Sequence, residues 1–70
     1  MMHLVLIQIS DTEYRAADGT TVQREYGKTP NGNNVGGAWV LRDVEGEWID
    51  HDTYINDLRE RNKLELVDKE

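Results

Sequence analysis

The spacing of apolar residues predicts a small domain that begins with strands. Residues 3–9 form a run rich in Val, Ile and Leu that is too short for a helix, so they predict a buried strand. Residues 12–17 and 20–26 flank Asp18-Gly19, a dipeptide that favours a hairpin turn because Gly accepts a positive φ without steric cost. Few side chains of this hairpin are apolar, and we therefore expect it at an edge of the sheet.

A glycine-rich segment separates this hairpin from a second one. Residues 27–37 contain four of the six glycines, the only proline and three asparagines, a composition that predicts a flexible loop. Strands are predicted over 38–42 and 47–49, and residues 43–46 between them suit a type I turn with Gly46 in the left-handed position. These two strands form the second predicted hairpin.

A helix is predicted directly after the second hairpin. Tyr54, Ile55 and Leu58 fall on one helical face at positions i, i+1 and i+4. Asp50 or Asp52 is expected to cap the first turn, because a carboxylate there accepts hydrogen bonds from free backbone N–H groups. The helix would thus begin soon after the second hairpin ends.

The end of the chain completes an α+β fold. Asn62 is a reasonable end for the helix, and residues 64–67 predict a short final strand. The order of elements indicates a small antiparallel or mixed sheet, built from an N-terminal strand and two hairpins, with one C-terminal helix packed on a face. We expect residues 1–70 to form a single domain, because so short a chain holds at most one.

Composition narrows the classes of function. The chain has no Cys, which excludes disulfides, and its two imidazoles, His3 and His51, are too few for a structural zinc site. We expect neither a metal nor another cofactor. A core of this size supplies only roughly 3–5 kcal/mol of net stability, so a homodimer is one way to gain more. An enzyme is disfavoured because so small a core encloses little of a pocket.

The acidic residues are concentrated in one part of the chain. Residues 1–42 carry four acids and four bases, whereas residues 43–70 carry ten acids and four bases, which accounts for the formal net charge of −6. Direct binding of nucleic acid or an anionic membrane is not expected, because both are recognised through clustered Lys and Arg. The N-terminus does not resemble a signal segment and no stretch is long enough to span a bilayer, so a cytoplasmic location is expected.

The densest acidic stretch, residues 43–52, is the candidate binding site. Packed like charges repel one another, and a basic surface on another protein would relieve that repulsion and be steered toward it. The leading hypothesis is a non-enzymatic protein-binding module, in its sharpest form an inhibitor that occupies the nucleic-acid-binding site of a larger protein. The competing interpretation is that turns and helix starts favour Asp and Glu for local reasons. The proposed partner-binding residues are Asp43, Glu45, Glu47, Trp48, Asp50 and Asp52.

Two tryptophans suggest either an interface or a core. Trp48 lies among the carboxylates and could anchor a partner, because Trp is over-represented at binding hot spots. In a chain without Phe, however, both Trp39 and Trp48 are needed to fill the interior. The predicted hairpin register makes them near-opposite neighbours on one sheet face, and a core position is favoured for both.

Three further features of the sequence each allow more than one interpretation. The 27–37 loop could form an anion-binding nest beside Lys28, although a flexible connector is the simpler interpretation. Helix capping explains Asp50-His51-Asp52 more simply than a metal or acid–base cluster does. The alternative function is a homo-oligomeric structural or assembly subunit that pairs through the strand Leu4–Ile9. A size and acidity of this kind are typical of many small accessory proteins of bacteria and their phages.

Overall fold

Six strands and one helix make up the part of the chain that the structure, a computed structural model, describes: residues 4–28, 32 and 34–69. Apolar residues alternate along the strands and fall on one helical face at residues 55 and 58, which explains why these segments form strands and a helix. The elements are β1 (Leu4–Ser10), β2 (Glu13–Ala16), β3 (Thr21–Lys28), β4 (Asn34–Arg42), β5 (Trp48–Asp52), α1 (Ile55–Asn62) and β6 (Leu64–Val67).

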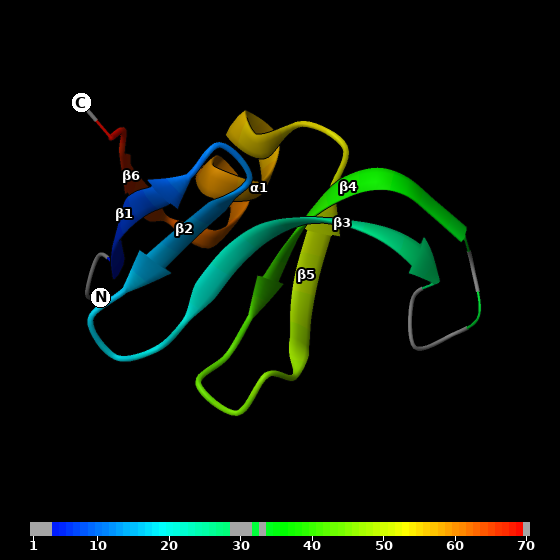
Figure 1. The fold of residues 1–70 in the computed structure, drawn as a ribbon, viewed down its shortest axis with the longest axis horizontal. Helices are drawn as coiled ribbons and strands as arrows, with labels where there is room; N and C mark the ends of the chain where they lie inside the picture. The colour runs from blue at the N-terminus through cyan, green and yellow to red at the C-terminus, as the bar shows by residue number, and fades with distance from the viewer. Residues whose placement is uncertain (1–3, 29–31, 33, 70) are drawn as a thin grey trace.

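The strands form one mixed, curled sheet in the order β5-β4-β3-β2-β1-β6. All neighbouring strands are antiparallel except β1 and β6, which run parallel. Helix α1 links the two edge strands, β5 and β6, and contacts both of them and β4, as Figure 1 shows. The predicted α+β fold class, with its two hairpins, single helix and short final strand, is confirmed.

The core lies between α1 and the sheet face that it covers, here called the helix face. Leu58 is the fully buried residue of α1, and Leu6 and Val22 meet it from the sheet with no exposed surface. Burying one such side chain stabilises the fold by about 2 kcal/mol. The buried residues of this cluster are Leu6, Tyr14, Ala16, Val22, Leu41, Leu58 and Leu64, with Leu4, Trp39, Ile55 and Leu66 packed against them. Ala38 and Val40 of β4 are also buried, and their alternation with Trp39 and Leu41 places them on the opposite face of the sheet.

The first hairpin lies inside the sheet, which makes the expected edge position wrong. Strand β2 is paired with β1 on one side and with β3 on the other. Its two apolar residues, Tyr14 and Ala16, both point to the helix face and are buried, and Tyr14 is paired with Val22. A strand needs apolar residues on only one face in such a sheet, so two are enough for this short strand.

Strand pairing extends into the glycine-rich segment from both sides. Strand β3 continues to its last residue at 28 and β4 begins at 34, so part of the predicted 27–37 loop is an antiparallel ladder. Gly37 has a φ of +85°, which is strained for a residue with a side chain, and a Cβ there would lie 2.8 Å from Cε1 of Tyr26, so the position favours Gly. The rest of the predicted loop, residues 29–31 and 33, lies outside the described residues.

The helix begins later than its predicted caps. Its N-cap residue is Tyr54, which has extended backbone angles and makes no side-chain capping bond. Asp50 and Asp52 both lie in β5, so the prediction that one of them caps the first turn is wrong. The helix ends at Asn62 as expected, and its C-cap residue, Lys63, takes the left-handed conformation with a φ of +57°.

Candidate functional site

The β4–β5 turn places two glutamates at an exposed tip. The turn is closed by a hydrogen bond from the Gly46 N–H to the Asp43 carbonyl oxygen at 3.0 Å, and Gly46 has the expected positive φ of +86°. The Asp43 carboxylate accepts from the N–H groups of Glu45 and Glu47 at 2.9 and 3.0 Å. Asp43 therefore stabilises the turn itself, as Asp commonly does in turns.

Glu45 and Glu47 both point to solvent. Neither side chain makes a hydrogen bond or an ion pair with any other described residue. The pKa of Arg42 is raised mainly by its hydrogen bonds to Glu25 and to a smaller degree by the charge of Glu47. We call Glu45 and Glu47 the acidic tip, because both are available to a partner.

The hairpin register separates the two tryptophans, so the prediction that they are opposite neighbours is wrong. Trp39 is paired with Asp52, whereas Trp48 is paired with Arg42. The register shifts after Leu41, which turns Trp48 to the sheet face opposite the helix face. Trp39 packs against the core as expected, whereas Trp48 is half-buried outside the core cluster. We call this second face the open face.

Trp48 is supported by charged and aromatic neighbours rather than by the core. The Arg42 guanidinium carbon lies 5.4 Å from the centre of the Trp48 ring, a cation–π distance. Arg42 is held in place by two hydrogen bonds to Glu25 at 2.7 and 2.8 Å and by one to the Gly46 carbonyl oxygen at 2.6 Å. His51 packs edge-on against the indole, with ring centres 5.2 Å apart. The indole is thus fixed beside the acidic tip.

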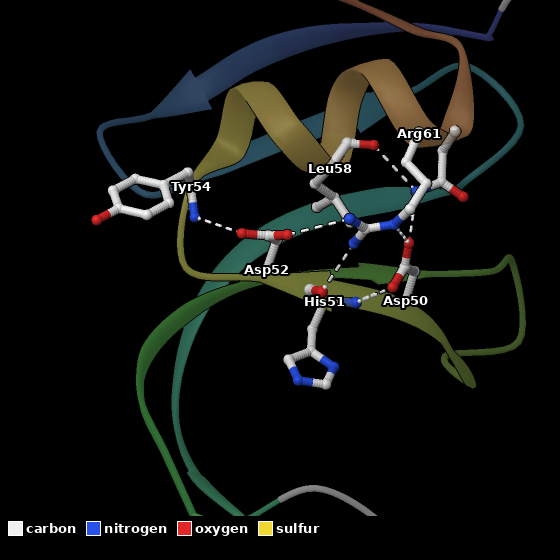
Figure 2. Close-up of polar contacts among 7 residues, drawn as sticks. Asp50, His51, Asp52, Tyr54, Leu58 and Arg61 are labelled. Atoms are coloured by element: carbon white, nitrogen blue, oxygen red, sulfur yellow. Dashed lines mark hydrogen bonds and ion pairs between the residues drawn. The ribbon is translucent and has the colours of Figure 1, made fainter.

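Asp50 and Asp52 form a separate cluster with Arg61, which we call the Arg61 clamp. Figure 2 shows the Arg61 side chain reaching from α1 to both carboxylates of β5, while the His51 ring points away. Arg61 Nε donates to Asp50 at 2.8 Å and Nη1 donates to Asp52 at 3.1 Å. Its Nη2 donates to the His51 carbonyl oxygen at 3.1 Å, and Asn62 donates to Asp50 at 2.9 Å. The clamp therefore ties the end of α1 to an edge strand.

Strand geometry explains why this cluster forms. Asp50 and Asp52 are two residues apart in β5, so their side chains share the face on which their cross-strand partners, Leu41 and Trp39, meet the core. Arg61 lies in the last turn of α1, where a cation also interacts favourably with the helix dipole. A short helix folding back over β5 brings the three together.

The hydrogen bonds of the clamp change its acid–base behaviour. The pKa of Asp50 is lowered to about 2, mainly by the hydrogen bond from Arg61. The hydrogen bonds from the Asn62 side chain and from the His51 backbone N–H lower it further. The pKa of Asp52 is also lowered, first by the hydrogen bond from the Tyr54 N–H and then by Arg61. Both carboxylates are therefore ionised at neutral pH and already paired with a cation of the same chain.

The six candidate residues thus divide among three environments. Asp50 and Asp52 are engaged in the Arg61 clamp, and Asp43 is engaged in its own turn. Glu45 and Glu47 remain at the acidic tip, with Trp48 beside them on the open face. The structure does not bring the six to one anionic surface, and a partner-binding role for any of them stays a prediction.

Two arginines that shape this region were not predicted from the sequence. Neither Arg61 nor Arg42 was assigned a role from the sequence, yet each organises a cluster of hydrogen bonds. The sequence contained one indication of the role of Arg61. If the second strand of the hairpin is extended to Asp52, then Asp50 and Asp52 share a face of the sheet, and two neighbouring carboxylates are stabilised by a cation between them. No comparable signal in the sequence marks Arg42.

Metal-ligand groups, membrane-spanning helices and similar proteins give no further indication of what the chain does. Among the described residues, no group of three or more His, Cys, Asp or Glu side chains could hold a metal ion. In the same part of the chain no helix is both long and apolar enough to cross a bilayer. Comparison with protein-family models, with curated proteins and with solved structures finds no match to this chain.

Proposed function

We propose that the chain is a non-enzymatic protein-binding module that docks the acidic tip on a basic surface of a larger protein. The observation that carries this proposal is the contrast in pairing around the β4–β5 turn. Glu45 and Glu47 are exposed and unpaired within the described structure, while Asp43 fixes the backbone that presents them. A preorganised pair of carboxylates binds a cationic surface without a large ordering cost.

Trp48 adds an apolar contact at the edge of the tip. Arg42 covers one side of its ring and His51 meets it edge-on, so the indole is held in one orientation although it is only half-buried. Aromatic side chains fixed in this way are frequent anchors of protein interfaces. The proposed contact surface therefore combines two carboxylates with one side of an indole.

The sharpest form of the proposal is an inhibitor of a nucleic-acid-binding protein. Carboxylates on a rigid turn present negative charge to the same Lys and Arg residues that bind phosphates. The protein would then compete with nucleic acid for that site, in the cytoplasm, without binding nucleic acid itself. Its binding to the partner should weaken with added salt, because contacts between exposed charges are screened.

A charge-reversal experiment tests this proposal. The bait proteins are the natural chain, the variant E45K/E47K and the control variant D57K/E60K, which changes the net charge equally but on the exposed side of α1. Binding partners captured from a host extract are quantified by mass spectrometry, and the affinity of the captured protein for each bait is then measured. We expect the tip variant to bind about tenfold or more weakly than the control.

Two outcomes decide between forms of the proposal. Displacement of the captured protein by double-stranded DNA supports the inhibitor form, since it shows that both ligands use one site. Equal loss of binding in E45K/E47K and D57K/E60K contradicts the proposal, because it shows that overall charge and not the tip determines binding.

A further inference from the structure

A group of exposed aliphatic side chains lies on the open face at the other end of the sheet. Val5, Ile7 and Ile9 of β1 are 43%, 56% and 43% exposed, and Val67 of the neighbouring β6 is 39% exposed. Single exposed aliphatic residues are normal on protein surfaces, whereas a contiguous group marks an interaction site. We call these four residues the aliphatic patch.

The patch is contiguous because of the strand register. Ile7 is paired with Val67 across the parallel β1–β6 ladder, and Val5 is paired with Glu65 in the same ladder. On the other side of β1, Ile7 is paired with Arg15 of β2. The patch therefore has an acidic flank, Glu65 on β6, and a flank on β2 where Arg15 is ion-paired with Glu13.

The strands that carry the patch are fixed by contacts on the helix face. The Tyr14 hydroxyl donates to Asp68 at 2.8 Å, which ties the segment after β6 to β2. The Lys69 N–H donates to the Gln8 side-chain oxygen at 2.8 Å, which ties the same segment to β1. The patch is therefore preformed and loses little conformational freedom when it is covered.

We propose that the aliphatic patch is a homodimer interface, covered by the same patch of a second copy of this chain. A two-fold interface needs a surface that is complementary to itself. If the two-fold axis runs along β1, then β2 of one copy lies over β6 of the other. Arg15 of each copy then lies level with Val67 of the other copy, and its side chain meets Glu65 of that copy by extending two residues along β6, while Ile7 and its neighbours pack together at the centre.

Charge favours a second copy over a strongly charged foreign partner. The flanking Arg15 and Glu65 have opposite signs, and the acidic tip lies between β4 and β5, near the other edge of the sheet. Within one copy, Arg15 forms an ion pair with Glu13 at 2.9 Å, and the arginine side chain is 55% exposed. Exchanging Glu13 for Glu65 of the second copy as the partner of Arg15 therefore costs little. This inference is independent of the proposed function, because the dimer leaves both acidic tips uncovered.

Sedimentation measurements over a wide concentration range test the dimer. We expect the natural chain to dimerise and the variant I7K to raise the dissociation constant at least about a hundredfold, because two buried lysines would face each other across the axis. The control is I49K, which makes the same substitution at an isoleucine of β5 that is 53% exposed, and it should dimerise as the natural chain does. A natural chain that stays monomeric up to millimolar concentration overturns the proposal, as does equal weakening by I7K and I49K.

A charge exchange tests the arrangement and does not depend on the stability of I7K. The single variants R15E and E65R should each weaken the dimer, since they place like charges opposite each other. The double variant R15E/E65R restores opposite charges across the axis and should recover the natural dissociation constant within about threefold. Absence of recovery in a double variant with an unchanged circular dichroism spectrum overturns the proposed interface.

Discussion

The acidic tip and the Arg61 clamp are two acidic regions only a few residues apart that have opposite roles. Glu45 and Glu47 project from a turn and make no ion pair within the described residues. Asp50 and Asp52 belong to the strand that follows directly, and both are bonded to Arg61. The fold forms direct ion pairs only in the clamp, whereas Arg42 bonds to the Gly46 carbonyl oxygen at the tip and interacts with Glu47 through charge alone.

This difference shows what decides whether a carboxylate is available to a partner. The turn of the tip is closed by one aspartate and one glycine within five residues, and Arg42 of the adjoining strand bonds to the Gly46 carbonyl oxygen. The clamp is not local, because its arginine lies nine and eleven residues further along the chain and arrives only when α1 folds back over β5. Availability therefore depends on tertiary structure even where charge density is evident from the sequence.

The largest expected effect comes from separating α1 from the sheet with L58A. Leu58 has no exposed surface and lies between α1 and the strands, so its truncation should lower the free energy of unfolding by about 3 kcal/mol. Urea denaturation measures this loss. The clamp should open in the same variant, while the tip should keep its turn, which amide hydrogen exchange at Gly46 would report. Equal loss of protection at the tip would contradict the distinction between the two regions.

A smaller effect is expected when the clamp alone is changed with D50N. The pKa of Asp50 is lowered from 3.8 to about 2 in the fold, which corresponds to at most about 2 kcal/mol of stability at neutral pH. Because the folded pKa lies below the unfolded one, this stability is present above about pH 4 and is lost as the pH falls toward 2.

The acid dependence of D50N distinguishes the clamp from general acid unfolding. The stability difference between the natural chain and D50N should shrink steadily from about pH 4 to about pH 2, as measured by urea denaturation at each pH. The control D57N, an exposed acid of α1, should show no comparable convergence. A stability difference that is constant over this range would show that the ionised Asp50 does not stabilise the fold.

A still smaller effect is expected for D43A, which removes the carboxylate that fixes the tip. Two exposed hydrogen bonds to backbone N–H groups are lost, and the free energy of unfolding should fall by about 1 kcal/mol. The same variant should bind the proposed partner more weakly, because the tip is no longer preorganised. Thermal unfolding and binding are measured on one sample, and unchanged values of both would show that Asp43 has no such role.

The smallest effect on stability is expected at the tip itself. The variant E45Q/E47Q removes two exposed charges that have no cation bonded to them in the described structure, so the free energy of unfolding, measured by urea denaturation, should stay within about 0.5 kcal/mol of the natural value. Removing two of several like charges should, if anything, stabilise the fold slightly. A clear loss of stability would mean that the tip, like β5, carries a structural pairing.

Much of the fold followed from local pattern. The strand at β1, the turns at Gly19 and Gly46, the helical stripe and the short final strand all depend on residues close in sequence, and the structure contains each of them. The prediction that the first strand is buried is wrong on one face, where Val5, Ile7 and Ile9 are 43%, 56% and 43% exposed. The interior position of the first hairpin did not follow, because the number of apolar residues in a strand does not reveal whether both its edges are paired.

The candidate site was predictable only in part. The register shift after Leu41 turns Trp48 away from the core, and a shift of one residue leaves no trace in the alternation of so short a strand. The bond between Arg61 and Asp50 depends on where α1 packs, which no local pattern specifies. By contrast, the turn from Asp43 to Gly46 was predicted correctly, because the hydrogen bond that closes it joins two residues that are close in sequence.

Direct titration of the Asp50 carboxyl carbon by NMR is the most direct test of the division between clamp and tip. The account predicts a pKa of about 2 for Asp50 in the natural chain and a rise toward 3.8 in the variant R61A, which removes the largest cause of the shift. An Asp50 that already titrates near 3.8 in the natural chain would contradict the account, because its carboxylate would then be as available to a partner as those of the tip.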